Sequence, residues 1–372
     1  MIFNTSEVHL PLMLSVKNIL ITQYRNYALS GFDFKERIVG ICGLNGHGKT
    51  NLLDTIYYCC FTRSYFSRPD AMNVQFGSDG FRIEAIMELN SEPQHIVCIN
   101  RGQGKKEFSL NDAGYERLSQ HIGRFPCVMI APDDIELITG GSEERRKFVD
   151  TVLSQLDNEY LQQLIIYGKV LQQRNSLLKR FAEQGQTDKF LLEVLDQQLV
   201  QPGIIIHKKR KAFATDLIPL VQQFYQSISG SEEMVTLQYE SQLNDTDFIT
   251  LLNNFRQKDI VLQRSNGGIH KDEMQLQLNG KIFKTTASQG QRKSLLFALK
   301  LAEFEILKTS KGFPPLLLLD DVFEKLDGLR MNNLLQWVCN DNTGQVFITD
   351  TDQERLSAAL GQVGVKFEII EL

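Results

Sequence analysis

Apolar and polar positions alternate near the start of the chain, a pattern that predicts β-strands. The alternation runs from Leu14 to Ile21, and further strand-like stretches cover Tyr27 to Phe34 and Arg37 to Cys42. The third stretch is apolar almost throughout, as expected for a central strand that is buried on both faces. From residue 51 to 62 the spacing becomes helical, and this predicts a strand, a glycine-rich turn and then a helix.

Residues 81–111 again alternate with period two, broken by the turn Gly102-Gln103-Gly104, so we expect an antiparallel meander there. Residues 142–255 carry helical patterns, and the longest of them, Lys189 to Phe224, is expected to be interrupted at Gln201-Pro202-Gly203. Strand-like residues return at Met274 to Leu278 and Lys281 to Lys284. A helix, a Leu-rich strand and a short α/β tail come after them.

This order predicts an α/β protein with a helical insertion between two halves. We expect a head built from residues 13–140 and 265–372, with a helical arm over residues 141–264 inserted between them. The pattern of residues 1–12 differs from that of the strand region beginning at Met13. These twelve residues therefore form a possible N-terminal extension, and Met13 is an alternative start.

Composition narrows the class of protein. The hydrophobic fraction is 42% and the charged fraction 23%, which excludes collagen-like and disordered chains. The net charge is -5, so a nucleic-acid partner would need a local basic patch. The six cysteines show no zinc spacing and are expected to be reduced, buried thiols. Because there is neither a membrane-spanning apolar run nor a signal-peptide pattern, we predict a cytoplasmic protein without a membrane partner.

A complete phosphate-binding loop comes directly after the third strand. The stretch from Gly43 to Thr50 matches G-x-x-x-x-G-K-[ST] and lies between a predicted buried strand and a helix, which is the context this motif requires. Its glycines let backbone N–H groups surround phosphates, Lys49 reaches the β and γ phosphates, and Thr50 coordinates Mg²⁺. The candidate nucleotide-binding residues here are Gly43, Leu44, Asn45, Gly46, His47, Gly48, Lys49, Thr50 and Asn51.

A second motif supplies the carboxylates that such a site needs. The apolar stretch Pro315 to Leu319 ends in Asp320 and Asp321, and α/β sheets bind ligands at the carboxyl ends of their strands. We expect Asp320 to hold Mg²⁺ and Asp321 to orient or deprotonate the attacking water. The alternative is a solvated pair of acids. Asp320 lies 271 residues after Lys49 (320 minus 49), so a large insertion separates the two halves of the site.

Ser288-Gln289-Gly290-Gln291 opens an apolar-striped helix about 30 residues before the acidic strand end. Free N–H groups and the positive end of a helix dipole make such a start an anion site. Taken alone, Ser288 would be only a helix N-cap. Its place before the Leu-rich strand favours a nucleotide-binding signature instead.

The phosphate loop, the SQGQ signature and the LLLLDD strand stand in the order of ABC-type ATPases with SMC-like heads. More narrowly, the chain from Met13 resembles the RecF family of bacterial DNA replication and repair proteins. The blocks that carry this resemblance are Gln23 to Tyr27, Ala131 to Leu137, Arg145 to Asp150, Tyr167 to Leu178 and Ala287 to Glu303.

The resemblance implies an ATP-dependent homodimer. Ser288 and Gly290 of one subunit would close on the γ-phosphate held by Lys49, Thr50 and Asp320 of the other, with ATP and Mg²⁺ as cofactors. It also implies binding of double-stranded DNA near single-strand gaps, work with RecR and RecO, and help in loading RecA. Two departures stand out: Gly268 to Asp272 replaces a Gly-Pro-His-Arg-Asp run, and Asp321 replaces a glutamate, which predicts slow ATP hydrolysis.

Several further residues are open to two interpretations. Gln75 is either a magnesium-sensing glutamine or a solvated loop residue, and His47 either contacts nucleotide or faces outward. Thr351 or Asp352 is either a switch residue near the γ-phosphate or part of a plain turn. For DNA phosphates the candidates are Lys208, Lys209, Arg210 and Lys211, with Lys105 and Lys106 as a second group; otherwise these are solvated charges.

Alternative functions from other classes are a different SMC-like ATPase, a nucleotide-dependent scaffold without a RecA-loading role, and a transporter-associated ABC subunit. The Asp320-Asp321 pair argues against the scaffold. The helical insertion argues against the transporter subunit.

Overall fold

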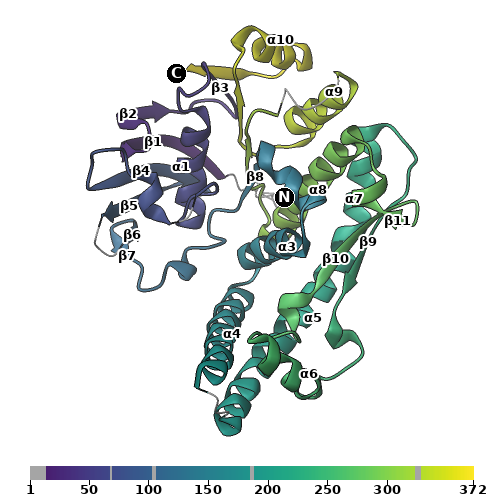
Figure 1. The fold of residues 1–372 in the computed structure, drawn as a ribbon. Helices are drawn as coiled ribbons and strands as arrows, with labels where there is room; N and C mark the ends of the chain where they lie inside the picture. Colours follow the sequence, from purple (N-terminus) through teal and green to yellow (C-terminus); the bar gives the residue numbers. More distant parts are fainter. Residues whose placement is uncertain (1–13, 68, 103–105, 185–187, 323–327) are drawn as a thin grey trace, which may run out of the picture. The chain divides into compact units, whose positions relative to one another are not determined.

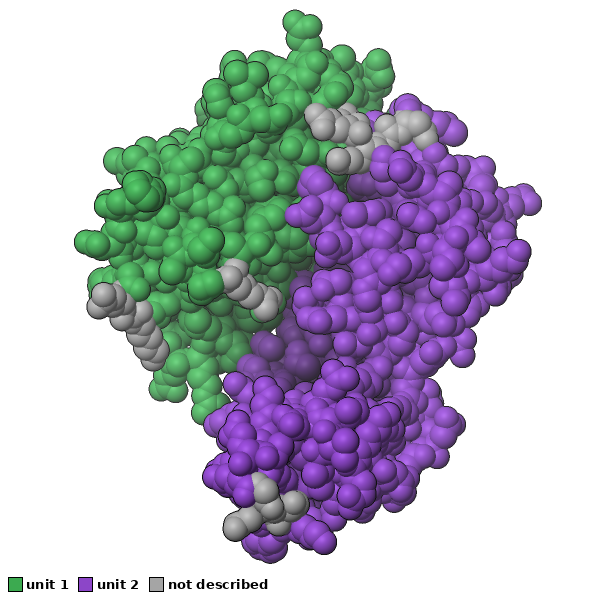
Figure 2. Space-filling view, in the orientation of Figure 1, with its two compact units in different colours: residues 1–131, 304–324, 334–372 green, residues 132–303, 325–333 purple. Residues whose placement is uncertain are grey.

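The computed structural model describes residues 14–67, 69–102, 106–184, 188–322 and 328–372. The expected N-terminal extension, residues 1–12, lies outside the described residues. The chain forms two compact units (Figure 2). The first unit consists of Met1–Ala131, Phe304–Glu324 and Leu334–Leu372, and the second of Pro132–Glu303 and Lys325–Asn333.

The first unit contains an antiparallel sheet in the order β2-β1-β4-β5-β6-β7 (Figure 1). Its alternating burial confirms the strands expected near the start of the chain and the meander. The meander's central turn at Gln103 and Gly104 lies outside the described residues. The strands are β1 (Leu14–Tyr24), β2 (Tyr27–Asp33), β4 (Gly80–Leu89), β5 (Glu92–Arg101), β6 (Glu107–Leu110) and β7 (Ala113–Gly114), and short 3₁₀ turns are η1 (Asp70–Asn73) and η2 (Leu118–Gln120).

A second sheet of the first unit is parallel throughout, in the order β14-β3-β13-β12-β8. Strands β3, β8, β12 and β13 are buried along their whole length, which explains their continuous apolar runs. The carboxyl ends of β3, β13 and β12 are therefore neighbours at one edge. The bounds are β3 (Ile38–Cys42), β8 (Cys127–Ile130), β12 (Leu316–Leu319), β13 (Val346–Asp350) and β14 (Phe367–Glu371), with helix α10 (Gln353–Val363) and the π-helical turn η7 (Trp337–Asp341).

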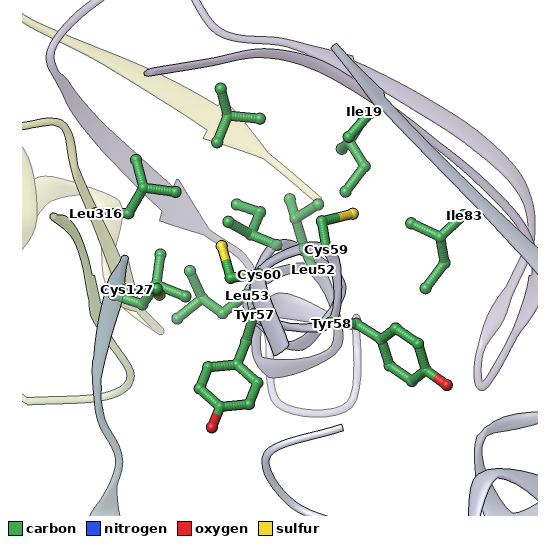
Figure 3. Close-up of a cluster of buried hydrophobic side chains, with 14 of the residues drawn as sticks. Ile19, Leu52, Leu53, Tyr57, Tyr58, Cys59, Cys60, Ile83, Cys127 and Leu316 are labelled. Carbon is green, nitrogen blue, oxygen red and sulfur yellow. The ribbon is translucent and has the colours of Figure 1, made fainter. Parts of the chain in front are cut away.

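Helix α1 (Lys49–Phe61) lies in the core that joins these two sheets (Figure 3). Its side chains meet Ile19 and Ile83 of the antiparallel sheet, and Cys127 and Leu316 of the parallel sheet, in one buried cluster. Burial of this helix on several sides fixes the loop that precedes it. All six cysteines are free and buried, which confirms the expectation of buried thiols.

The second unit combines long helices with a three-stranded antiparallel sheet, β11-β10-β9. Helices α4 and α5 pack along each other (Figure 1). The elements are η3 (Pro132–Ile135), α2 (Glu136–Thr139), α3 (Ser142–Leu156), α4 (Asn158–Gln184), α5 (Lys189–Ser229), β9 (Val235–Glu240), η4 (Gln242–Asn244), α6 (Phe248–Leu262), η5 (Ile269–Lys271), β10 (Glu273–Leu278), β11 (Lys281–Ile282) and α7 (Phe283–Thr286). Helices α8 (Gln289–Lys311) and α9 (Gly328–Gln336) begin in this unit and continue into the first.

The structure differs from the sequence expectation in several places. The strand expected over Lys281 to Lys284 ends at Ile282, and Phe283 and Lys284 begin α7. Helix α5 is one element of 41 residues that continues through Pro202, where a break was expected. At the next residue, Gly203, a Cβ would lie 2.1 Å from Cε1 of Phe248, so α5 and α6 pack closely there. Strand β9 also lies in the region expected to be helical, and it pairs with β10 in register Leu237 to Leu276.

This strand pairing bears on the division of the chain. Residues 265–303 are part of the second unit, together with the paired strands β9 and β10, and the first unit resumes at Phe304. The expected head began at residue 265 instead. No helix in the described part of the chain is long and apolar enough to cross a membrane.

Candidate nucleotide-binding site

The loop from Gly43 to Thr50 turns from the end of β3 into α1. Gly46 and Gly48 have φ angles of 85° and 108°, a backbone conformation that residues other than glycine rarely adopt. A Cβ on Gly48 would also lie 2.6 Å from Nδ2 of Asn26, so glycine is required there for space as well. Leu44, Asn45, Gly46 and His47 are exposed, and the loop thus presents its backbone to solvent.

Lys49 is directed back across this loop. Its Nζ donates hydrogen bonds to the carbonyl oxygens of Gly43, at 2.8 Å, and Leu44, at 3.3 Å. The residue is only 4% exposed, so these two carbonyls hold its ammonium group within the loop. His47 is exposed, and its Nδ1 lies 3.1 Å from a main-chain oxygen of Leu372.

Thr50, Asp320 and Thr349 come together at the carboxyl edge of the parallel sheet. The Thr50 hydroxyl donates to Oδ1 and Oδ2 of Asp320 at 3.1 and 3.0 Å, and the Thr349 hydroxyl donates to Oδ1 at 2.9 Å. Burial raises the pKa of the Asp320 carboxyl to about 6, although its hydrogen bond from Thr349 opposes the shift. The site therefore holds a desolvated carboxylate beside the threonine of the loop.

Asp321 comes next in the left-handed region, with a φ of 44°. Its backbone N–H donates to Oγ1 of Thr349 at 2.8 Å. A non-glycine residue in this region is uncommon, and such conformations cluster at functional sites. Thr349 thus organises both acids: it donates to one and accepts from the backbone of the next.

Thr349 was not singled out from the sequence, although the residues after it were. Asp352 is the N-cap of α10, where its Oδ1 accepts from the backbone N–H of Arg355 at 3.0 Å. The signal that could have identified Thr349 is strand register. As a buried polar residue near the carboxyl end of β13, it lies next to the end of β12.

The turn between β1 and β2 supports the phosphate loop. Asn26 Nδ2 donates to the His47 carbonyl at 3.1 Å, and the Tyr27 hydroxyl donates to the Gly48 carbonyl at 3.1 Å. Asn51 Nδ2 donates to Oδ1 of Asn26 at 2.6 Å, so Asn51 is bonded to this support. These contacts give the Gln23 to Tyr27 block, which the sequence offered only as a point of resemblance, a structural role at the loop.

Gln75 lies in the loop after η1, half-buried, with its backbone N–H donating to the Gln23 carbonyl at 2.8 Å. This loop is tied to the same β1–β2 turn, because the Arg25 backbone N–H donates to the Asn73 carbonyl at 2.8 Å. Gln75 is thus connected through main-chain contacts to the segment that supports the phosphate loop.

The signature residues begin α8 in the second unit. Ser288 and Gln289 are exposed, and Gly290 is half-buried. The Ser288 N–H donates to Oε1 of Gln291 at 2.7 Å, and the Gln291 N–H donates to the Ser288 hydroxyl at 3.3 Å. This reciprocal pair is a capping box. Ser288 therefore caps the helix, and its exposure leaves it accessible to a ligand as well.

The basic run on α5 is only partly exposed, which corrects the expectation of a four-residue phosphate-binding patch. Arg210 is 3% exposed, and its guanidinium bonds to Asp150 and Asp272, each at 2.9 Å. Lys209 pairs with Asp157 at 2.6 Å, whereas Lys208 and Lys211 are exposed. Arg210 is thus unavailable to a DNA phosphate in this structure.

The expectation for the second basic group, Lys105 and Lys106, is corrected at Lys106. The Nζ of Lys106 donates to the Tyr58 hydroxyl, the Thr62 carbonyl and Oδ2 of Asp70, at 3.0, 2.7 and 2.6 Å. This lysine is therefore bound to the protein itself. Lys105 lies outside the described residues.

Comparison with known proteins identifies the fold. A sequence profile described as an AAA domain matches residues 14–336. A solved structure of the "recombination mediator protein RecF-ATP in RecFOR pathway" has a TM-score of 0.86 and 29% identity, over 93% of this chain and 94% of that chain. An Smc head domain from Pyrococcus furiosus has a TM-score of 0.55 at 13% identity, over 96% and 93% of the two chains, and shows a shared fold.

Sequence similarity to known proteins extends over nearly the whole chain. The DNA replication and repair protein RecF of Flavobacterium johnsoniae is 43% identical over 358 residues, which is 96% of this chain and 99% of that protein. RecF of Bacteroides fragilis is 42% identical over 358 residues, 96% of each chain.

The phosphate loop after β3 and the acids after β12, in a fold shared with Smc heads, define a P-loop ATPase head of the ABC and SMC-like class. This confirms the predicted fold class. Within that class, the chain belongs to the RecF family of DNA replication and repair proteins.

Proposed function

We propose that this chain is an ATP-dependent DNA-binding protein of replication and recombinational repair. ATP closes a homodimer on duplex DNA, and slow hydrolysis reopens it. The observation that carries the proposal is the Thr50–Asp320 pair beside the phosphate loop, since a Mg²⁺–ATP site needs a hydroxyl and a carboxylate at this place.

The donors at this pair suit a hard divalent cation. Thr50 and Asp320 offer only oxygen atoms, which Mg²⁺ prefers. Asp320 is 3% exposed, and a nearby cation would favour its charged form, which burial disfavours. Bound Mg²⁺ supplies positive charge opposite the β and γ phosphates. Thr50 and Asp320 are the residues of this chain that would hold it.

The other residues have distinct tasks. Lys49 exchanges its contacts with the Gly43 and Leu44 carbonyls for phosphate oxygens, and the loop N–H groups receive the remaining phosphate oxygens. Asp321 orients the attacking water. Ser288 and Gly290 act on the nucleotide held by the other subunit, so the γ-phosphate links two chains and its loss releases them.

The DNA and protein partners are inferred from the family. We place the duplex near single-strand gaps, with RecR and RecO as partners and RecA loading as the outcome. On this chain, Lys208 and Lys211 are the exposed members of the α5 basic run and are the phosphate contacts we propose. A local patch is needed because the net charge of -5 repels DNA.

Sedimentation of the chain with ATP, with ADP and without nucleotide tests this function. We expect a dimer with ATP and a monomer in the other two conditions. Ser288→Arg should preserve ATP binding by the monomer but prevent the dimer, because the long cation fills the space needed by the γ-phosphate of the partner. A dimer that forms equally without ATP, or that survives Ser288→Arg, contradicts the proposal.

A further inference from the structure

Gln291, the last residue of the signature, is bonded in two directions. Its Oε1 accepts from the backbone N–H of Ser288 at 2.7 Å, and its Nε2 donates to Oε1 of Glu233 at 2.6 Å. Glu233 lies in the connection between α5 and β9, 58 residues before Gln291 in the chain. The signature at the start of α8 is thus bonded to a residue in the connection that follows another helix, α5.

The chemistry of Glu233 decides which way the Gln291 amide faces. A carboxamide has a donor end and an acceptor end, and the two ends have almost the same shape. An ionised carboxylate only accepts, so it must face Nε2. Oε1 is then left to face the Ser288 N–H. The Ser288 N–H and the Glu233 carboxylate therefore favour the same orientation of the amide, and without Glu233 only the Ser288 N–H holds it.

Glu233 is itself held firmly. Its Oε2 accepts from the Tyr225 hydroxyl at 2.8 Å and from the Ser231 hydroxyl at 3.1 Å, and its backbone carbonyl accepts from Nε2 of Gln222 at 3.1 Å. Burial raises the pKa of Tyr225, and the neighbouring Glu233 raises it further, so the phenol remains a donor. The carboxylate is therefore fixed to the last turns of α5.

A second contact holds the same turn of α8. A Cβ on Gly290 would lie 3.0 Å from Nη1 of Arg330, so the guanidinium packs against the signature backbone. Arg330 Nε donates to the Ser294 hydroxyl at 3.0 Å, one turn further along α8. The turn is held at Gly290 and at Gln291, while Ser288 stays exposed.

We propose that Glu233 is a positioning residue for the signature: through the Gln291 amide it fixes Ser288 in the orientation that meets the γ-phosphate of the other subunit. This inference rests on the proposed role of Ser288 in the ATP-dependent dimer. It also connects α5 to the signature, because Tyr225 near the end of α5 holds Glu233. The same helix carries Lys208 and Lys211, the proposed DNA contacts.

The first test compares Glu233→Ala with Glu232→Ala. Glu232 is the exposed neighbour, so its variant makes the same change of charge without touching Gln291. We expect Glu233→Ala to weaken ATP-dependent dimerisation by about tenfold or more, the effect of losing a charge-assisted hydrogen bond. ATP affinity of the monomer should stay as in the parent chain. Glu233→Gln keeps an acceptor oxygen and should restore most of the dimer.

A double-mutant cycle distinguishes the positioning role of Glu233 from a merely structural one. In a Gln291→Ala background, Glu233→Ala should weaken the dimer no further, because the residue acts through that amide. Additive losses would overturn the inference. Tyr225→Phe, which leaves the carboxylate but removes one of its donors, should weaken dimerisation less than Glu233→Ala and serves if that variant is poorly folded.

The result can be separated from failure of the proposed function. If Ser288→Arg leaves the ATP-dependent dimer intact, the trans role of the signature is wrong. If Ser288→Arg abolishes the dimer while Glu233→Ala dimerises like the parent chain, only the positioning role is wrong.

Discussion

The hydroxyl of Thr50 donates to both carboxylate oxygens of Asp320, although 270 residues separate the two in the chain. Two strands of one parallel sheet make this possible. Thr50 comes after β3 and Asp320 after β12, and β13 lies between these strands and contributes Thr349. The larger segment of the second unit, Pro132–Glu303, lies in the chain between the two halves of the site, and the shared sheet edge brings these halves together.

Lys49→Ala should remove tight ATP binding, because the loop then lacks the fixed charge opposite the phosphates. We expect a loss of about 100-fold in affinity, measured by titration with a fluorescent ATP analogue. Lys35→Ala, at an exposed lysine of the same unit, is the control. Unchanged affinity in Lys49→Ala would exclude the loop as the nucleotide site.

Asp321→Asn should stop hydrolysis and leave a stable dimer in ATP. Asparagine tolerates the left-handed backbone of this position, so the substitution removes the carboxylate while preserving the local conformation. Loss of a general base lowers turnover by about 10² to 10⁴. Phosphate release and sedimentation in ATP measure the two effects. Normal turnover in this variant would place the base elsewhere.

Asp320→Asn tests the effect of the raised pKa. A carboxyl whose pKa rises from about 4 in the unfolded chain to about 6 on folding adds stability below pH 4 and loses that contribution as pH rises through 6. Asparagine never ionises. The measured quantity is the free energy of unfolding of the variant minus that of the parent chain, without metal or nucleotide. This difference should be about 3 kcal/mol more positive at pH 8 than at pH 4.

Urea denaturation at a series of pH values measures this difference. The gap between variant and parent should grow between pH 4 and pH 7 and then level off. A gap that is constant across this range would show that Asp320 is ionised in the folded protein as readily as in the unfolded chain.

Replacing the two exposed lysines of the α5 run, Lys208→Gln with Lys211→Gln, should weaken duplex DNA binding in the ATP state. Each lost phosphate contact reduces the slope of log affinity against log salt by about 0.9. ATP-dependent dimerisation should remain. If affinity and salt slope match the parent chain, these lysines are solvated charges and the DNA contacts lie on another surface.

Arg210→Gln is expected to act on stability instead. The buried guanidinium neutralises Asp150 and Asp272, and its removal leaves their carboxylates uncompensated. Breaking such a pair costs about 3–5 kcal/mol in free energy of unfolding. Urea denaturation measures it, with Lys211→Gln as the exposed control from the same run. Equal stability of the two variants would contradict the structural role of Arg210.

The local elements of the first unit could be predicted from the sequence because their signals are short-range. The apolar run before Gly43, the glycine spacing of the loop and the Leu-rich strand before Asp320 each determine a conformation from neighbouring residues. The same holds for Ser288, whose position before a helix is visible in the sequence, and whose capping bond the structure describes.

Contacts between residues far apart in the chain depend on how the elements pack, and no local pattern specifies them. Thr349 reaches Asp320 because two strands pair in one register, and Gln291 reaches Glu233 across 58 positions of the chain. The helix α5 continues through Pro202, and its next residue, Gly203, packs against Phe248 of α6, a contact that the local sequence does not specify.

The basic run on α5 shows the same division between local pattern and packing. In the sequence, Arg210 is one of four consecutive basic residues, and no neighbouring residue separates its role from that of Lys211. Burial against two aspartates makes Arg210 a structural residue, and exposure leaves Lys211 accessible to a ligand. The sequence alone determined that positive charge is concentrated here, and the folded chain decided which of these charges solvent can reach, because burial depends on residues that are distant in sequence.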